Sequence, residues 1–269
     1  MLKTEGYQTL IVEQKGKVGV IRLNRPEKRN AFIPEMYRDL DAVLTAMEDE
    51  QDVKAIMITA AGKAFCAGGD IQLMQENLKK GLRNVDNRRY LKKLHQSWLT
   101  RIINIDKPVV CAVNGYAAGA GFSLALLGDI VIASAKAKFV SSFIRVGLTV
   151  DMAGLYFLPR IVGLNRAKEL IFTGREVSAE EAYALGIVAK VVEPEELEEA
   201  ALAVAGQLAD SALVPIGLQK QILNKIFETD LPTLLEKEEL CFAHCKDTKD
   251  FANAVDAFLN KRQPEFSGS

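Results

Sequence analysis

The sequence has little of the chemistry on which several common protein classes depend. It contains two histidines, one tryptophan and four cysteines in 269 residues. Four cysteines are too few for a disulfide scaffold in a chain of this length, so a reducing compartment is expected. Acidic residues (35) and basic residues (34) nearly cancel, and the net charge is −1. The protein therefore lacks a global positive field for nucleic acid or an anionic membrane, and an anionic ligand must meet a local basic patch.

Long apolar runs are also missing from the sequence. The most apolar stretch, residues 116–128, has 13 residues, whereas a helix that spans a bilayer needs about 20. The first residues contain no apolar segment typical of a secretory signal. Hydrophobic residues make up 49% and charged residues 26%, the balance of an ordinary globular protein. We expect a cytoplasmic protein with no membrane partner and no nucleic-acid partner.

Short β-branched runs alternate with helical patterns over the first two thirds of the chain. Strands are expected at residues 9–12, 18–23, 53–58, 109–113, 130–133 and 188–192. Helices are expected between them at residues 34–50, 88–105 and 179–185. This alternation predicts an α/β domain.

The last third of the sequence has a different character. Helical patterns follow one another without a strand between them, at residues 194–210, 214–227, 231–245 and 248–261. We therefore divide the chain into an α/β core over residues 1–195 and a helical region over residues 196–269. No linker rich in proline or serine separates the two parts. The helices should pack on the core or on a neighbouring subunit.

Two loops rich in small residues each follow a strand and open a helix. They are residues 67–71 (AGGDI) and residues 118–121 (AGAG). Small side chains expose the N–H groups of the following helical turn, where the helix dipole favours negative charge. Each loop offers one N–H group, so the pair predicts an oxyanion hole.

Three other kinds of site fit the sequence less well. A dinucleotide site would need a third glycine where Leu124 stands. A hydrolase nucleophile at Ser123 lacks the glycine that closes the motif and lacks a convincing histidine partner. Cys241, His244 and Cys245 share one helical stretch without a fourth ligand nearby, so no metal site is expected.

Several blocks, taken in order along the chain, make the sequence similar to the crotonase family of enoyl-CoA hydratases and isomerases. Besides the two loops, these blocks are residues 24–31 (NRPEKRNA), 147–154 (GLTVDMAG), 158–163 (LPRIVG), 173–175 (TGR), 182–188 (AYALGIV) and 257–262 (AFLNKR). The resemblance implies the crotonase fold, a spiral of strand–strand–helix turns followed by C-terminal helices. It also implies an acyl-CoA thioester as substrate, with no cofactor beyond the coenzyme A moiety of that substrate.

The resemblance also implies roles for individual residues. It places the oxyanion N–H groups at Gly69 and Ala120. It implies contacts to coenzyme A for Lys28, Arg29, Ala31, Ala67, Ile71, Phe258 and Lys261. Of these, Phe258 and Lys261 would reach the coenzyme A of a neighbouring subunit, so the helical region would serve oligomerisation in a homotrimer or homohexamer.

Departures from the hydratase pattern of the family predict the reaction. Ser123 and Phe143 occupy the two positions where hydratases hold glutamates, and Asp151 is the carboxylate that remains nearby. This pattern resembles the isomerases of the family, above all the 1,2-epoxyphenylacetyl-CoA isomerases. We expect an acyl-CoA isomerase in which Asp151 moves a proton and the oxyanion hole holds the enolate.

Other interpretations stay open at this point. Asp151 could instead cap a short helix at residues 153–158. The protein could also be a hydratase with a different base, an acyl-CoA hydrolase, or a non-catalytic member that binds acyl-CoA.

Overall fold

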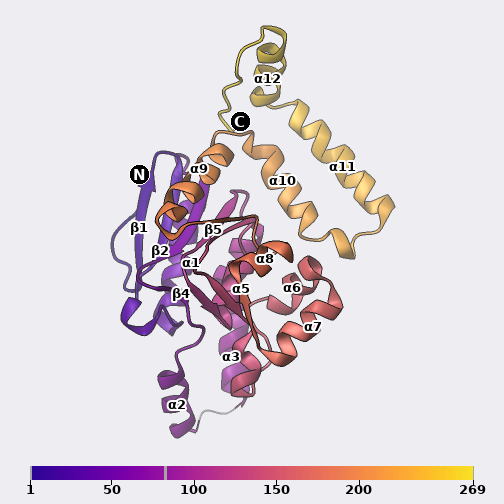
Figure 1. The fold of residues 1–269 in the computed structure, drawn as a ribbon. Coiled ribbons are helices and arrows are strands. Elements are labelled where there is room, and N and C mark those ends of the chain that lie inside the picture. Colours follow the sequence, from indigo (N-terminus) through magenta and orange to yellow (C-terminus); the bar gives the residue numbers. More distant parts are fainter. Residues whose placement is uncertain (1, 82–83, 269) are drawn as a thin grey trace.

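The computed structural model describes residues 2–81 and 84–268, which form two β-sheets surrounded by helices (Figure 1). The larger sheet has six strands in the order β1 (Leu10–Lys15), β2 (Val18–Leu23), β3 (Ala55–Ala60), β5 (Val109–Val113), β7 (Ile130–Ser134) and β10 (Lys190–Val192). The smaller sheet has four strands in the order β4 (Ala64–Cys66), β6 (Tyr116–Ala118), β8 (Lys138–Val140) and β9 (Glu176–Ser178).

The strands follow a repeated route between the two sheets. From β2 to β10 the larger sheet is parallel, and only β1 pairs antiparallel, with Leu10 opposite Leu23. The chain runs through a strand of the larger sheet, then one of the smaller sheet, then helices, as in β3–β4–α2, β5–β6–α5 and β7–β8–α6. This is the expected spiral of strand–strand–helix turns.

The helices have these bounds: α1 (Pro34–Asp49), α2 (Ile71–Lys79), α3 (Asn84–Leu94), α4 (Thr100–Asn104), α5 (Ala120–Leu126), α6 (Gly154–Val162), α7 (Leu164–Thr173), α8 (Ala179–Ala184), α9 (Leu197–Ala209), α10 (Leu213–Leu223), α11 (Leu231–Lys246) and α12 (Lys249–Leu259). One short 3-10 turn, Pro26–Lys28, lies within the loop at residues 24–31. Another, Ser142–Val146, precedes the loop that carries Asp151.

One expected helix is broken. The pattern at residues 88–105 predicted a continuous helix, but α3 and α4 are joined by a π-helical turn, His95–Leu99, in which Ser97 is non-helical (φ −99°, ψ −115°). The break accompanies the burial of Trp98, which is 1% exposed. Its ring packs 6.2 Å from the Phe32 ring and 6.0 Å from the Tyr37 ring, measured between centroids. The break in the helix thus coincides with the place where a large aromatic side chain enters the core.

The core lies on both faces of the larger sheet. Every residue of β3 and β5 is buried, which is typical of parallel strands covered on both sides. One face packs against α1 and the smaller sheet, and the other packs against α9. The residues of α9 that face the sheet include Ala201 and Ala205, and such small side chains let the helix lie close to the strands.

The later helices extend away from this body (Figure 1). No residue of α11 is buried, and large apolar side chains are exposed on α11 and α12, among them Leu235, Leu240, Phe242, Phe251, Phe258 and Leu259. The tail after α12 folds back, and Lys54 Nζ donates to Ser267 O at 3.1 Å. The division at residues 195/196 and the role of residues 196–269 in oligomerisation therefore stay predictions, although α9 itself packs on the sheet.

Among the described helices, no single one has the length and apolar character to cross a bilayer. Among the same described helices, one pair, Pro194–Ala209 and Leu213–Leu223, has sufficient length and apolar character when the two helices are taken together, but the pair is bent by 105° at the break between them.

Candidate active site

The two loops rich in small residues meet at one edge of the smaller sheet. Strands β4 and β6 are neighbours and parallel, so their carboxyl ends bring the loops that follow to the same place. Gly68 has φ +92°, and a Cβ there would lie only 2.9 Å from Ala118 O and 3.5 Å from Ala120 N. Glycine at residue 68 is thus needed for its backbone conformation and for the close approach of the loops.

The N–H groups of Gly69 and Ala120 are available at this junction. Phe32 N–H donates to Gly68 O at 2.7 Å, and Asp70 N–H donates to Phe32 O at 3.1 Å. This bridge uses the residues on either side of Gly69 and does not involve the Gly69 N–H group. Ala120 is the first residue of α5. Within residues 2–81 and 84–268, neither N–H group has a hydrogen-bond acceptor. The arrangement offers two donors to a ligand oxygen.

Cys66 forms part of the wall behind this junction. A Cβ on Gly121 would lie 2.2 Å from Cys66 O, so α5 packs directly on the end of β4. The Cys66 side chain is fully buried, and burial raises the pKa of its thiol to about 12. Cys66 is therefore a protonated packing residue at neutral pH and has no nucleophilic thiolate.

The loop at residues 24–31 is held beside the junction by Asn30. This residue is fully buried with φ +56°. Its Oδ1 accepts from Arg25 N–H at 2.8 Å, and its Nδ2 donates to Ala61 O and Ala64 O at 2.9 Å each. One side-chain amide thus joins the loop to the ends of β3 and β4.

Asp70 has a structural role at the start of α2. Its carboxylate accepts from the N–H groups of Gln72 and Leu73, and Arg25 Nη2 lies 3.3 Å away. Burial alone would raise the pKa of Asp70, but the hydrogen bonds from Leu73 and Arg25 outweigh it and lower the pKa. An anionic cap committed to these partners is a poor candidate for a proton carrier.

The structure brings together five of the residues expected to contact coenzyme A: Lys28, Arg29, Ala31, Ala67 and Ile71. Lys28 and Arg29 are exposed, and Lys28 Nζ donates to Gln72 Oε1 at 2.8 Å. Ala67 N–H donates to Arg29 O at 2.9 Å, which places the two loops side by side. Ile71 is 58% exposed. A basic edge thus adjoins an exposed apolar side chain, two residues beyond Gly69 in the sequence.

Phe258 and Lys261 lie elsewhere. Phe258 lies in the last turn of α12 and Lys261 follows that helix, and Figure 1 shows α12 and α2 at opposite ends of the molecule. Phe258 is 84% exposed. These two residues therefore do not take part in the site of their own chain.

Asp151 lies on a loop that is attached to α5. Ser123 Oγ–H donates to Asp151 O at 2.8 Å, and Gly154 N–H donates to the same oxygen at 3.1 Å. The Asp151 carboxylate accepts from Met152 N–H at 2.7 Å. Helix α6 begins only at Gly154, with Ala153 in the N-cap position, so Asp151 is not the cap of this helix.

Apolar side chains flank Asp151 in the sequence and border the loop at Gly119. The Phe143 ring lies 3.9 Å from the place a Cβ on Gly119 would take, so it borders the oxyanion loop. Met152 is 3% exposed, whereas Leu148 is 48% exposed. The Ser123 side chain is also buried, at 3% exposure. Phe143 and Ser123 both face this region without providing a carboxylate.

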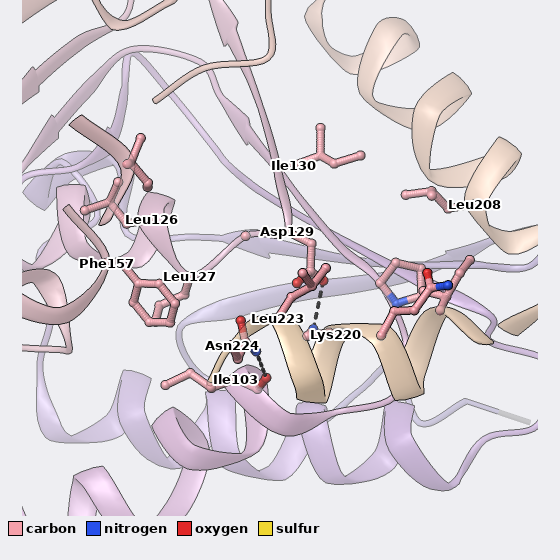
Figure 2. A pocket seen from close by; sticks show the side chains of 15 residues that line it. Ile103, Leu126, Leu127, Asp129, Ile130, Phe157, Leu208, Lys220, Leu223 and Asn224 are labelled. Atoms are coloured by element: carbon pink, nitrogen blue, oxygen red, sulfur yellow. Dashed lines mark hydrogen bonds and ion pairs between the residues drawn. The ribbon is translucent and has the colours of Figure 1, made fainter. Parts of the chain in front are cut away.

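A pocket that the sequence did not indicate lies between α10 and the body of the protein (Figure 2). Its volume is about 360 Å³, and Figure 2 shows Leu126, Leu127 and Phe157 on its apolar side. Lys220 donates to Asp129 at 2.8 Å across it. Burial raises the pKa of Asp129, although the Lys220 ammonium opposes this effect. The pocket lies at the far end of α5 from Ala120, and its ion pair anchors α10 to the core.

Comparison with known proteins identifies the class to which this fold and site belong. The model of the enoyl-CoA hydratase/isomerase family matches residues 13–269. The chain belongs to this family, the crotonases, and the predictions of family and fold are confirmed.

Individual relatives cover nearly the whole chain. A short-chain-enoyl-CoA hydratase from Clostridium acetobutylicum is 37% identical over 257 residues, which is 95% of this chain and 96% of the relative. A 1,2-epoxyphenylacetyl-CoA isomerase from Escherichia coli is 38% identical over 255 residues, again 95% of this chain and 96% of the relative. The crystal structure of a putative enoyl-CoA hydratase from Streptomyces coelicolor is 31% identical with a TM-score of 0.93, and the match covers 100% of this chain and 98% of that one.

Proposed function

We propose that the protein is an acyl-CoA isomerase, which shifts a double bond or rearranges a ring of a CoA thioester by proton transfer. The observation that carries the proposal is the placement of Asp151. Its loop is attached by a hydrogen bond to α5, the helix that starts with Ala120, while Ser123 and Phe143 provide no carboxylate. A carboxylate on a loop attached to the helix that opens with Ala120, with no carboxylate at residues 123 and 143, suits isomerisation better than hydration.

In this mechanism the thioester carbonyl accepts hydrogen bonds from Gly69 N–H and Ala120 N–H. Loss of a proton from the acyl group places negative charge on that oxygen, where each donor stabilises the transition state by about 3 kcal/mol. Asp151 takes the proton and returns it to another carbon of the same acyl group. The thioester oxygen carries the charge only in the enolate, until Asp151 returns the proton, so the reaction needs no cofactor beyond the coenzyme A moiety of the substrate.

The remaining site residues would bind the coenzyme A moiety. Lys28 and Arg29 would face its phosphates, because ammonium and guanidinium groups form strong charge-assisted hydrogen bonds to phosphate oxygens. Ala31, Ala67 and Ile71 would line the path toward the oxyanion hole. Phe258 and Lys261 would complete the site of a neighbouring subunit in a homotrimer or homohexamer.

Hydration is the second candidate, and relatives named as hydratases favour it. In that case a water molecule would be activated by Asp151 or by a different base. The two reactions differ in mass balance, because hydration adds one water to the substrate and isomerisation adds nothing.

The deciding experiment presents the protein with a panel of 2-enoyl, 3-enoyl and ring-containing CoA thioesters and follows products by mass spectrometry in heavy water. Isomerisation products without added water are expected. Asp151→Asn should lower turnover by about 100-fold or more, since general acid–base catalysis contributes at least that much. Asp210→Asn, at an exposed carboxylate paired with Lys17, is the control and should keep wild-type turnover.

Two results would contradict the proposal. One is an Asp151→Asn variant with nearly normal isomerisation. The other is a wild-type protein that hydrates a 2-enoyl-CoA as fast as it isomerises any member of the panel.

A further inference from the structure

The hydroxyl group of Ser123 connects the two parts of the proposed site. Ser123 lies three residues after Ala120 on α5, about one helical turn further on. Its side chain is 3% exposed, and its Oγ–H donates to the backbone oxygen of Asp151 at 2.8 Å. A rigid helix thus carries both an oxyanion N–H group and the anchor of the Asp151 loop.

The loop that receives this hydrogen bond has an unfavourable backbone conformation. Met152 (φ +53°) and Ala153 (φ +59°) are successive non-glycine residues in the left-handed region. Such a conformation persists only when the surrounding contacts hold it. Asp151 O receives two donors, Ser123 Oγ–H and Gly154 N–H, and these close the turn.

The Ser123 hydroxyl is tightly packed against the turn that follows Asp151. A Cβ on Gly154 would lie 2.7 Å from Ser123 Oγ and 2.7 Å from Val150 Cγ1. The hydroxyl therefore sits between the helix and the turn. An ionised glutamate at residue 123 could only accept hydrogen bonds, so it could not make this contact to a carbonyl oxygen.

We propose that Ser123 is a positioning residue, which holds the carboxylate of Asp151 at a set place relative to the oxyanion N–H groups of Ala120 and Gly69. The inference rests on the proposed function, because it requires Asp151 to act as the base.

The structural half of the proposal is tested by amide hydrogen exchange. In Ser123→Ala, the amides of Met152 and Gly154 should exchange about fivefold faster or more, as expected for loss of a typical buried hydrogen bond. The matched control is Ser134→Ala, which removes an equally buried hydroxyl at the end of β7 that accepts from Lys136 N–H. Equal exchange of both loop amides in the wild type and in Ser123→Ala would overturn the proposal.

The catalytic half is tested by kinetics on the substrate that the wild type turns over. Ser123→Ala should lower kcat by about tenfold and leave KM within about twofold, because Lys28, Arg29 and the oxyanion N–H groups are untouched. Ser123→Thr, which keeps the hydroxyl, should restore most of kcat, and Ser134→Ala should not change it. In the double variant Ser123→Ala/Asp151→Asn, the rate should equal that of Asp151→Asn alone.

Failure of the inference differs from failure of the proposed function. Unchanged turnover in Asp151→Asn would refute the base itself. The positioning role alone would be refuted if Asp151→Asn lost turnover as expected while Ser123→Ala kept full kcat. Additive losses of kcat in the double variant would refute it too.

Discussion

Gly121→Ala tests whether the contact between α5 and β4 fixes the oxyanion hole. The new Cβ would lie 2.2 Å from Cys66 O and 2.7 Å from Cys66 Cβ. An ordinary contact needs about 3.5 Å, so the helix or the strand must move by about 1 Å. The obstructing oxygen belongs to the backbone and cannot rotate away as the end of a flexible side chain would.

The expected magnitude follows from two opposing terms. Overpacking of this kind costs up to about 3 kcal/mol, and the better helix propensity of alanine offsets about 1 kcal/mol of it. The net loss of about 2 kcal/mol should lower Tm by about 4–8 °C in a chain of this size. Because the Ala120 N–H group moves with the helix, a shift of about 1 Å should also lower kcat by about 100-fold.

The matched control is Gly206→Ala in α9. A Cβ there meets nothing within 4 Å, so only the propensity term remains and the protein should gain about 0.5–1 kcal/mol. Calorimetry at one protein concentration gives Tm for both variants, and the same preparations are used to measure turnover of the substrate that the wild type converts. A Gly121→Ala protein as stable and as active as Gly206→Ala would refute the argument that this contact positions the site.

Three further outcomes are expected. Asn30→Ala leaves Arg25 N–H and two carbonyl oxygens without their side-chain partner. The Tm should therefore fall by about 6–12 °C, as for a loss of about 3 kcal/mol in the free energy of unfolding. A fall in Tm of less than about 2 °C in calorimetry would contradict this. For Asp250, burial alone would raise the pKa, but hydrogen bonds from Ser267 and Gly268 lower it. Its contribution to stability is therefore complete above the usual pKa of about 3.9 and is lost as the pH falls through the lower folded value. In calorimetry the Tm gap between the wild type and Asp250→Asn should shrink below about pH 4, and a gap that widens on acidification would show that the sign is wrong. Arg29→Glu should weaken binding of a non-reacting acyl-CoA by about tenfold, and added salt should weaken wild-type binding as well; titration calorimetry measures both, and affinity indifferent to both changes would count against a basic phosphate contact.

Local patterns in the sequence were enough to predict the elements of the larger sheet. All six expected strands are present, although their ends differ from the expected ones by a few residues. Short runs of β-branched and apolar residues are typical of buried strands, so these elements were predictable. Helix α8 is another example, since Ser178 caps it as its position suggests and Gly186 follows its end. The two glycine-containing loops could also be predicted from the sequence, because only small residues allow the backbones of two loops to approach so closely.

The smaller sheet was beyond such patterns. Its strands have three residues each, too few to show a periodicity, and they are stabilised by partners far away in the sequence. The break in the helix around Ser97 could not be predicted from the sequence either, because the burial of Trp98 that accompanies it depends on tertiary contacts.

Residue identity therefore determined which chemical groups are available to this protein, whereas tertiary structure decided how they meet. Ser123 and Asp151 stand 28 positions apart. The resemblance implied only that Ser123 stands where hydratases of the family hold a glutamate. The hydrogen bond between them exists because β6 leads into α5 while β8 and its following turn bring residue 151 back to that helix. Asp129 and Lys220, 91 positions apart, were likewise joined only by packing of α10 on the core. Long-range pairs of this kind depend on the whole path of the chain, which no local pattern records.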